Sequence, residues 1–66
     1  MIQNSTEFLH SFFFGGELYS ADTIDRKVAV EVIDFCLRNK MIEVTQNNGK
    51  RLYRILPEGK KVIDRK

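Results

Sequence analysis

An Asn-Gly pair at positions 48 and 49 limits the fold of this chain more than any other feature. Both residues tolerate the positive φ angles that a two-residue type I′ turn needs at its central positions. Segments of alternating apolar and polar residues flank the pair, so we predict a β-hairpin over residues 42–55 with Val44 directly across from Tyr53. This register gathers the apolar residues on one face of the hairpin: Ile42, Val44, Tyr53 and Ile55.

The other face of the predicted hairpin and its tip are polar. Glu43 lies across from Arg54, which predicts a cross-strand ion pair. A three-residue loop would instead place Val44 opposite Leu52 and break the alternation, so we disfavour it. The tip carries no apolar side chain and consists of Gln46, Asn47, Asn48, Gly49, Lys50 and Arg51.

The first helix is predicted over residues 5–14, with Asn4 or Ser5 as its N-cap. Gly15 and Gly16 end it, because glycine takes the left-handed C-terminal conformation without strain. Phe14 falls off the apolar face of this helix, which consists of Phe8, Leu9, Phe12 and Phe13.

The middle of the chain predicts a short strand at residues 17–19, with Ser20 as the next N-cap and residues 21–24 as a single helical turn. The strongest helix is predicted over residues 26–41, with Asp25 as a plausible cap. At about 100° per residue, its apolar side chains fill one wide arc: Val28, Ala29, Val30, Val32, Ile33, Phe35, Cys36 and Leu37. Pro57 then opens a short basic helix over residues 57–66, with Val62 and Ile63 on the core.

An arc this wide implies burial on two sides of the predicted helix. One side would face the domain's own core and the other a second subunit, which predicts a homodimer. The alternative is that residues 8–14 and the hairpin cover the whole arc. The narrow polar side places each acid four residues from a base, which predicts two intrahelical ion pairs and an electrically neutral face. These residues are Lys27, Glu31, Asp34 and Arg38.

The length of 66 residues and the sparse set of chemical side chains exclude several classes of protein. No apolar run approaches the roughly 20 residues of a membrane span. One cysteine permits no internal disulfide, which fits a reducing, cytoplasmic location. One Cys and one His do not make a conventional zinc site, and so short a chain rarely builds a catalytic cleft. We therefore expect neither an enzyme nor a metal or other cofactor.

The charges are unevenly distributed along the chain. Residues 1–25 hold four acidic and no basic residues, a net charge of −4, whereas residues 26–66 hold eleven basic and five acidic residues, a net charge of +6. Such asymmetry is typical of a face that binds a polyanion. It is equally typical of two solvated surfaces that pair within the fold or between subunits.

The order of the elements resembles a winged helix-turn-helix domain. Residues 32–43 are similar to a recognition helix running into its wing, and residues 51–63 are similar to the last wing strand and its exit, as in MarR- and PadR-like regulators. The resemblance covers roughly residues 18–63 and implies a small α+β winged-helix domain spanning residues 1–66. Two positions depart from the family: the first helix of the motif is shortened to about one turn, and Lys40 replaces the usual glycine before the wing.

The resemblance implies a small transcriptional regulator that binds double-stranded DNA. The N-terminal end of the helix over residues 26–41 would enter the major groove, where Thr23, Arg26, Lys27 and Val30 would lie. The wing tip would follow the backbone or the minor groove with Asn47, Asn48, Lys50 and Arg51. Second-rank phosphate contacts are Arg38, Arg54, Lys60 and Lys61.

Two other functions remain open from the sequence. One is a winged helix that binds protein, using the wide apolar arc and the Phe-rich first helix without any nucleic acid. The other is a small inhibitor or accessory factor. The feature that separates DNA binding from protein binding is whether the basic residues at positions 26, 27, 50 and 51 converge on one surface.

Overall fold

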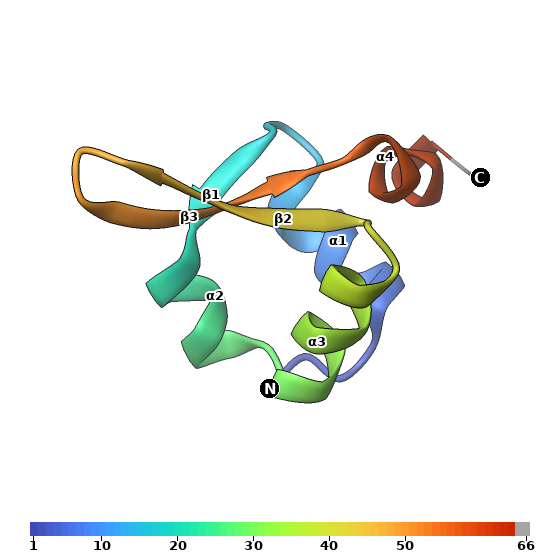
Figure 1. Ribbon diagram of the computed structural model, residues 1–66. Coiled ribbons are helices and arrows are strands. Elements are labelled where there is room, and N and C mark those ends of the chain that lie inside the picture. Colours follow the sequence, from blue (N-terminus) through green and yellow to red (C-terminus); the bar gives the residue numbers. More distant parts are fainter. Residues whose placement is uncertain (65–66) are drawn as a thin grey trace.

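The computed structural model describes residues 1–64, which form a small α+β fold with a winged-helix-like layout, as predicted. Figure 1 shows three helices on one side of a three-stranded antiparallel sheet of order β1-β3-β2, and a fourth helix at the end of the sheet opposite the hairpin tip. The elements are α1 (Ser5–Phe13), β1 (Leu18–Ser20), α2 (Ala21–Lys27), α3 (Val30–Arg38), β2 (Ile42–Asn47), β3 (Lys50–Ile55) and α4 (Pro57–Asp64). The last two residues of the helix predicted over 57–66 lie outside the described residues.

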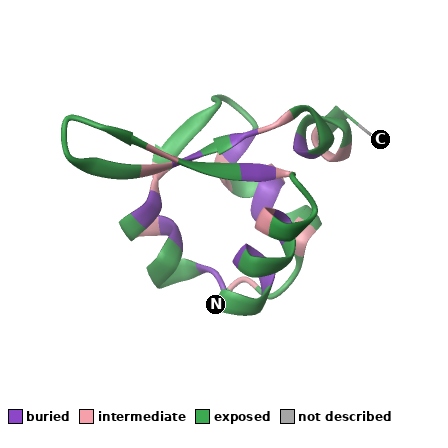
Figure 2. Cartoon of the chain, viewed as in Figure 1, coloured by how far each residue is buried: buried purple, intermediate pink, exposed green. Residues whose placement is uncertain are grey.

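The hairpin of β2 and β3 has the predicted register. Val44 lies across from Tyr53, and the turn residues Asn48 and Gly49 have φ angles of 54° and 79°, as a type I′ turn requires. The Glu43–Arg54 ion pair is present, with 3.7 Å between Oε2 and Nε. Figure 2 shows that the root of the hairpin is buried and its tip is fully exposed. The turn therefore projects from the body of the molecule.

Helix α1 supplies the largest side chains of the core. The Asn4 side chain caps it by accepting a hydrogen bond from the Glu7 N–H at 3.0 Å. Phe8 is fully buried and makes edge contacts with Phe12 and Phe13, each with 5.8 Å between ring centroids. Phe14 is 77% exposed, as its position off the apolar face predicts.

The predicted single helix over residues 26–41 is wrong, because the chain breaks at Val28 and Ala29. Both residues have extended ψ angles, 137° and 140°. The predicted single turn at residues 21–24 instead continues as α2 to Lys27, and Asp25 lies inside this helix and not at a cap. The predicted Lys27–Glu31 pair within one helix is therefore lost, whereas Asp34–Arg38 forms at 2.9 Å.

The N-terminal segment explains the break. The Ile2 N–H donates to the Lys27 carbonyl at 2.9 Å, and the Ile2 carbonyl accepts from the Ala29 N–H at 2.8 Å. This short parallel bridge satisfies two backbone groups that a continuous helix would use, while Val28 becomes buried to 1% exposure. Val28 is also β-branched, which lowers its preference for helix. Tertiary contacts thus outweigh the helical periodicity here.

Lys40 ends α3 in the left-handed conformation, with a φ angle of 58°. The Met41 N–H donates to the Cys36 carbonyl at 2.8 Å and the Lys40 N–H to the Leu37 carbonyl at 3.2 Å. This is the Schellman hydrogen-bond pattern, which usually has glycine at this position. Lys40 thus occupies the position at which this hydrogen-bond pattern usually has glycine, with strain from its Cβ atom.

We expect Lys40→Gly to stabilise the fold by about 0.5–1 kcal/mol. The left-handed conformation costs a non-glycine residue about 1–2 kcal/mol, and the extra chain entropy of unfolded glycine offsets part of the gain. Urea unfolding checks this value. Lys40→Ala is the control, since it removes the charge but keeps the Cβ atom and should give no comparable gain. If Lys40→Gly and Lys40→Ala were equally stable, the left-handed backbone at position 40 would not be a source of strain.

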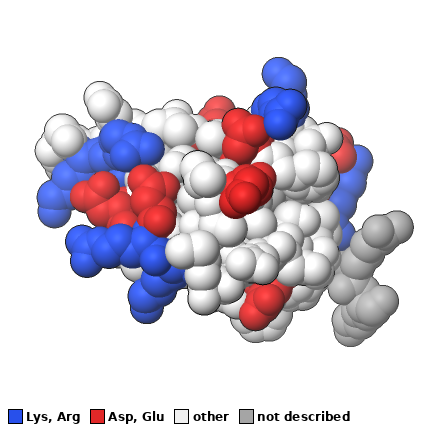
Figure 3. Space-filling model, turned by 90° about the horizontal axis from the view of Figure 1, so that it is seen from below, with Lys and Arg blue, Asp and Glu red and all other residues white. Residues whose placement is uncertain are grey.

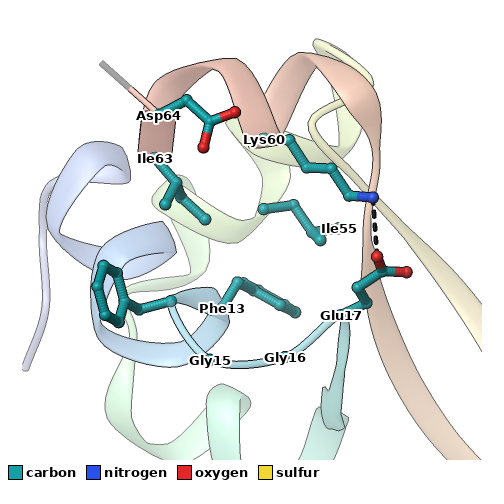
Figure 4. A pocket seen from close by; sticks show the side chains of 9 residues that line it. Phe13, Gly15, Gly16, Glu17, Ile55, Lys60, Ile63 and Asp64 are labelled. Carbon is teal, nitrogen blue, oxygen red and sulfur yellow. Dashed lines mark hydrogen bonds and ion pairs between the residues drawn. The ribbon is translucent and has the colours of Figure 1, made fainter. Parts of the chain in front are cut away.

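Helix α4 closes the end of the sheet away from the hairpin tip. A shallow hollow of about 400 Å³ lies there. Figure 4 shows it bounded by Phe13, Ile55 and Ile63 and by the loop of Gly15 and Gly16. The ion pair between Lys60 and Glu17, at 2.9 Å, crosses its rim and lowers the pKa of the Glu17 carboxyl. Val62 and Ile63 pack against the core as predicted. Within residues 1–64, no helix has the length and apolar character needed to cross a bilayer.

Candidate nucleic-acid interface

The seven predicted site residues lie on two elements, α2 and the hairpin, and not on α3. Thr23 is half-buried in the first turn of α2, where its N–H donates to the Ser20 hydroxyl at 3.4 Å. Arg26 and Lys27 are exposed in the last turn of α2. The prediction that they begin the recognition helix is therefore wrong, because α3 starts only at Val30. The hairpin residues are exposed at the tip as predicted: Asn47, Asn48, Lys50 and Arg51.

Arg51 is held between the hairpin and α2. Its Nη1 lies 3.5 Å from Oδ2 of Asp25, and its Nη2 donates to the Tyr53 hydroxyl at 3.4 Å. The Tyr53 hydroxyl in turn donates to Oδ1 of Asp25 at 3.0 Å. Burial of the ring and this bond to a carboxylate raise the pKa of Tyr53. The network fixes the hairpin over α2 and leaves the Arg51 side chain 45% exposed.

Asp25 and Tyr53 are the two members of the site that sequence reasoning missed. The predicted register places Tyr53 on the apolar face of the hairpin, and the structure shows it 3% exposed. A buried tyrosine hydroxyl needs a hydrogen-bond partner, so its partner could have been sought among nearby acids. The sequence gives no signal that this partner would be Asp25, which is distant along the chain and has the sequence context of a helix cap.

The positive charges without an internal partner concentrate near the predicted site. Within residues 1–64, five basic side chains have a carboxylate within 4.0 Å: Arg38, Arg51, Arg54, Lys60 and Lys61. The four basic side chains of this range that have none are Arg26, Lys27, Lys40 and Lys50. Three of these four belong to the predicted DNA-contacting set. The second-rank candidates are all paired with acids.

Basic side chains lie on both sides of a group of acidic side chains near the hairpin tip. Figure 3 shows basic side chains on both sides of acidic ones at the left end of the molecule, the end where Figure 1 places the hairpin tip. A shallow hollow there joins Asp22 of α2 to Lys50 and Arg51 of β3. Arg26 and Lys27, in the last turn of the same helix, line a separate hollow with Met1, Ile2 and Glu7. The basic residues at positions 26 and 27 and those at positions 50 and 51 therefore border two different hollows.

The exposed face of α3 does not resemble a surface for reading DNA. Its N-terminal turn presents Val30, 73% exposed, and Glu31, with Ala29 giving no side-chain cap. Further along, Asp34 binds Arg38, and Phe35 is 46% exposed. Carboxylates facing phosphates are repelled, and no basic side chain at the start of α3 offsets them. Base contacts from the N-terminal end of this helix are therefore unfavourable.

The described residues hold no cluster suited to metal binding. Within residues 1–64, no group of three or more His, Cys, Asp or Glu side chains is placed to hold an ion. Cys36 is fully buried on the inner side of α3, and desolvation raises the pKa of its thiol to about 11. A thiol in this environment stays protonated and unreactive at neutral pH.

Comparison of the chain with protein-family models, with curated protein sequences and with solved structures finds no match.

Proposed function

We propose that this chain is a small regulator that binds double-stranded DNA through its hairpin tip and the basic end of α2. The observation that carries the proposal is the set of unpaired cations on the hairpin and on α2, which packs against β3: Arg26, Lys27 and Lys50 have no carboxylate partner within residues 1–64. Contacts between such side chains and phosphates supply most of the free energy of sequence-independent DNA binding.

In this arrangement the hairpin tip makes the central contact. It projects from the fold, carries only polar side chains and is stiffened by the type I′ turn. Lys50 binds phosphate, and the amides of Asn47 and Asn48 supply hydrogen bonds to the backbone or the minor-groove edge. Arg51 is presented by Asp25 and Tyr53 in a fixed position, with half of its surface available.

Helix α3 takes a smaller part in this proposal than in the resembled family. The exposed Glu31 and Asp34 keep it away from phosphates, so any sequence preference comes from the hairpin side chains. Regulation of transcription and a cytoplasmic location belong to the same proposal. The winged-helix-like layout supports the first, and the single cysteine, which needs no oxidising compartment, supports the second.

Binding of a protein partner is the second candidate function. It is favoured by the exposed apolar side chains of α3, Val30 and Phe35, beside Glu31 and Asp34. Interfaces are enriched in such aromatic anchors. This function predicts no salt-dependent binding to DNA, which separates it from the first.

We expect Lys50→Ala combined with Arg51→Ala to weaken binding to a labelled random duplex at least about tenfold, and to lower the slope of log affinity against log salt by about two. Fluorescence anisotropy measures both. Lys60→Ala with Lys61→Ala is the matched control, because it removes the same charge from α4, where both lysines are paired with acids. Equal losses in the two variants would show that net charge alone matters and would remove the hairpin from the interface.

A further inference from the structure

We propose that the free edge of β2 pairs with the same edge of a second copy of the chain, giving a symmetric dimer with a continuous six-stranded sheet. This inference rests on the backbone of the hairpin and not on DNA binding, and the Asn47 side chain belongs to both proposed surfaces. Within residues 1–64, β2 pairs only with β3, so its outer edge has no strand beside it. The opposite edge of the sheet is β1, which is only three residues long.

The backbone groups that point to this edge can be identified from the register. The Met41 carbonyl accepts a hydrogen bond from the Leu56 N–H at 2.8 Å, so position 41 is a bonded position of the β2–β3 ladder. Bonded and non-bonded pairs alternate along an antiparallel ladder. The N–H and C=O groups of Ile42, Val44 and Gln46 therefore point away from β3. Ile42 is only 1% exposed, which leaves Val44 and Gln46 available.

The edge lacks the features that usually keep a strand from pairing with another chain. Natural edges are protected by lysine, proline, bulges or inward-pointing charges. Residues 42–47 contain no lysine, proline or glycine, and their register with β3 is continuous, without a bulge. The only charge is that of Glu43, which points to the outer face and binds Arg54. An edge of this composition is a template for a further strand.

In one register of the paired edges, the outward N–H and C=O groups of Val44 and Gln46 all form hydrogen bonds. This register places no two side chains of like charge across from each other. With the two-fold axis at Thr45, Val44 lies across from the other copy's Gln46 at both ends, which gives about four N–H···O=C bonds. The two Thr45 side chains face each other on the outer surface, a favourable cross-strand pair. Glu43 faces an Asn47 amide. Val44, 46% exposed although it lies on the helix-facing side, becomes covered.

Substitution of Gln46 by proline tests this edge with little effect on the hairpin. Proline removes the N–H that points outward and leaves the β2–β3 hydrogen bonds intact. We expect sedimentation equilibrium without DNA to show a dimer for the wild type and at least a tenfold larger dissociation constant for Gln46→Pro. The control Gln46→Thr keeps the N–H and should stay dimeric. Far-UV circular dichroism confirms that both variants are folded.

A cysteine at the two-fold axis tests the register itself. Residues directly opposed at a non-bonded antiparallel position lie within reach of a disulfide. Under mild oxidation, Thr45→Cys should form a covalent dimer and Glu43→Cys should not, because Glu43 faces Asn47. The native Cys36 is buried and stays out of this reaction.

Two results would overturn the edge dimer. The first is a wild-type protein that remains monomeric at every concentration measured. The second is a dimer that Gln46→Pro leaves intact and that Phe35→Ala dissociates, which would move the interface to α3. Because DNA is absent from these measurements, failure of the dimer and failure of DNA binding are observed separately.

Discussion

Phe8→Ala is expected to remove a large share of the free energy of unfolding. Phe8 has no solvent exposure and makes edge contacts with both Phe12 and Phe13. Truncation of a buried phenylalanine costs about 3–5 kcal/mol, through lost burial and the cavity left behind. At about 0.05–0.15 kcal/mol per residue, a domain of this size has a total stability of about 3–10 kcal/mol. The loss is therefore a large share of the whole.

Circular dichroism during urea unfolding measures this loss. Phe14→Ala is the matched control, because Phe14 follows directly after α1 and is 77% exposed. Its substitution should change the free energy of unfolding by no more than about 0.5 kcal/mol. If the two alanine variants were equally stable, the assignment of the Phe8 face as the core would be wrong.

Gly59→Ala is expected to destabilise the fold by about 1–3 kcal/mol, although alanine favours helix more than glycine does. A Cβ atom at position 59 would overlap the Met41 carbonyl oxygen and would lie 2.8 Å from Cγ1 of Ile55. That carbonyl already accepts the Leu56 N–H, so it cannot move without disturbing the start of β2. Glycine is required here because α4 approaches the backbone closely.

The control for this substitution is Gly16→Ala, at a position where a new Cβ atom meets nothing within 4 Å. Thermal unfolding should show a lowered midpoint for Gly59→Ala and little change for Gly16→Ala. A midpoint for Gly59→Ala at or above that of the wild type would mean that α4 does not pack as described.

The parts of the fold set by local interactions could be predicted from the sequence. Asn48 and Gly49 determine a turn, and the turn determines the register of every pair in the hairpin. The Asn4 cap likewise acts on its immediate neighbours. The prediction for the two glycines after α1 is wrong, because neither Gly15 nor Gly16 adopts the left-handed conformation. The order of the elements in residues 1–64 agrees with the predicted order, and the bounds of α2 and α3 do not.

The break between α2 and α3 could not be predicted, because its cause lies elsewhere in the chain. Residues 26–41 have helical periodicity throughout, and only the bridge from Ile2 replaces the helical hydrogen bonds at Lys27 and Ala29. For the candidate site, exposure of the hairpin tip was predictable from its composition. The tether of Arg51 to Asp25 was not, since it depends on the packing of α2 against β3.

The measurement that tests the central proposal most directly is a fluorescence-anisotropy titration of labelled random duplex DNA at about 50 and about 200 mM salt. If Arg26, Lys27, Lys50 and Arg51 contact phosphates, the affinity should fall by about 100-fold between the two conditions. Binding at low salt that collapses at high salt is the result we predict. Absence of binding at the lower salt would contradict the proposal and would leave the exposed face of α3 as a surface for a protein partner.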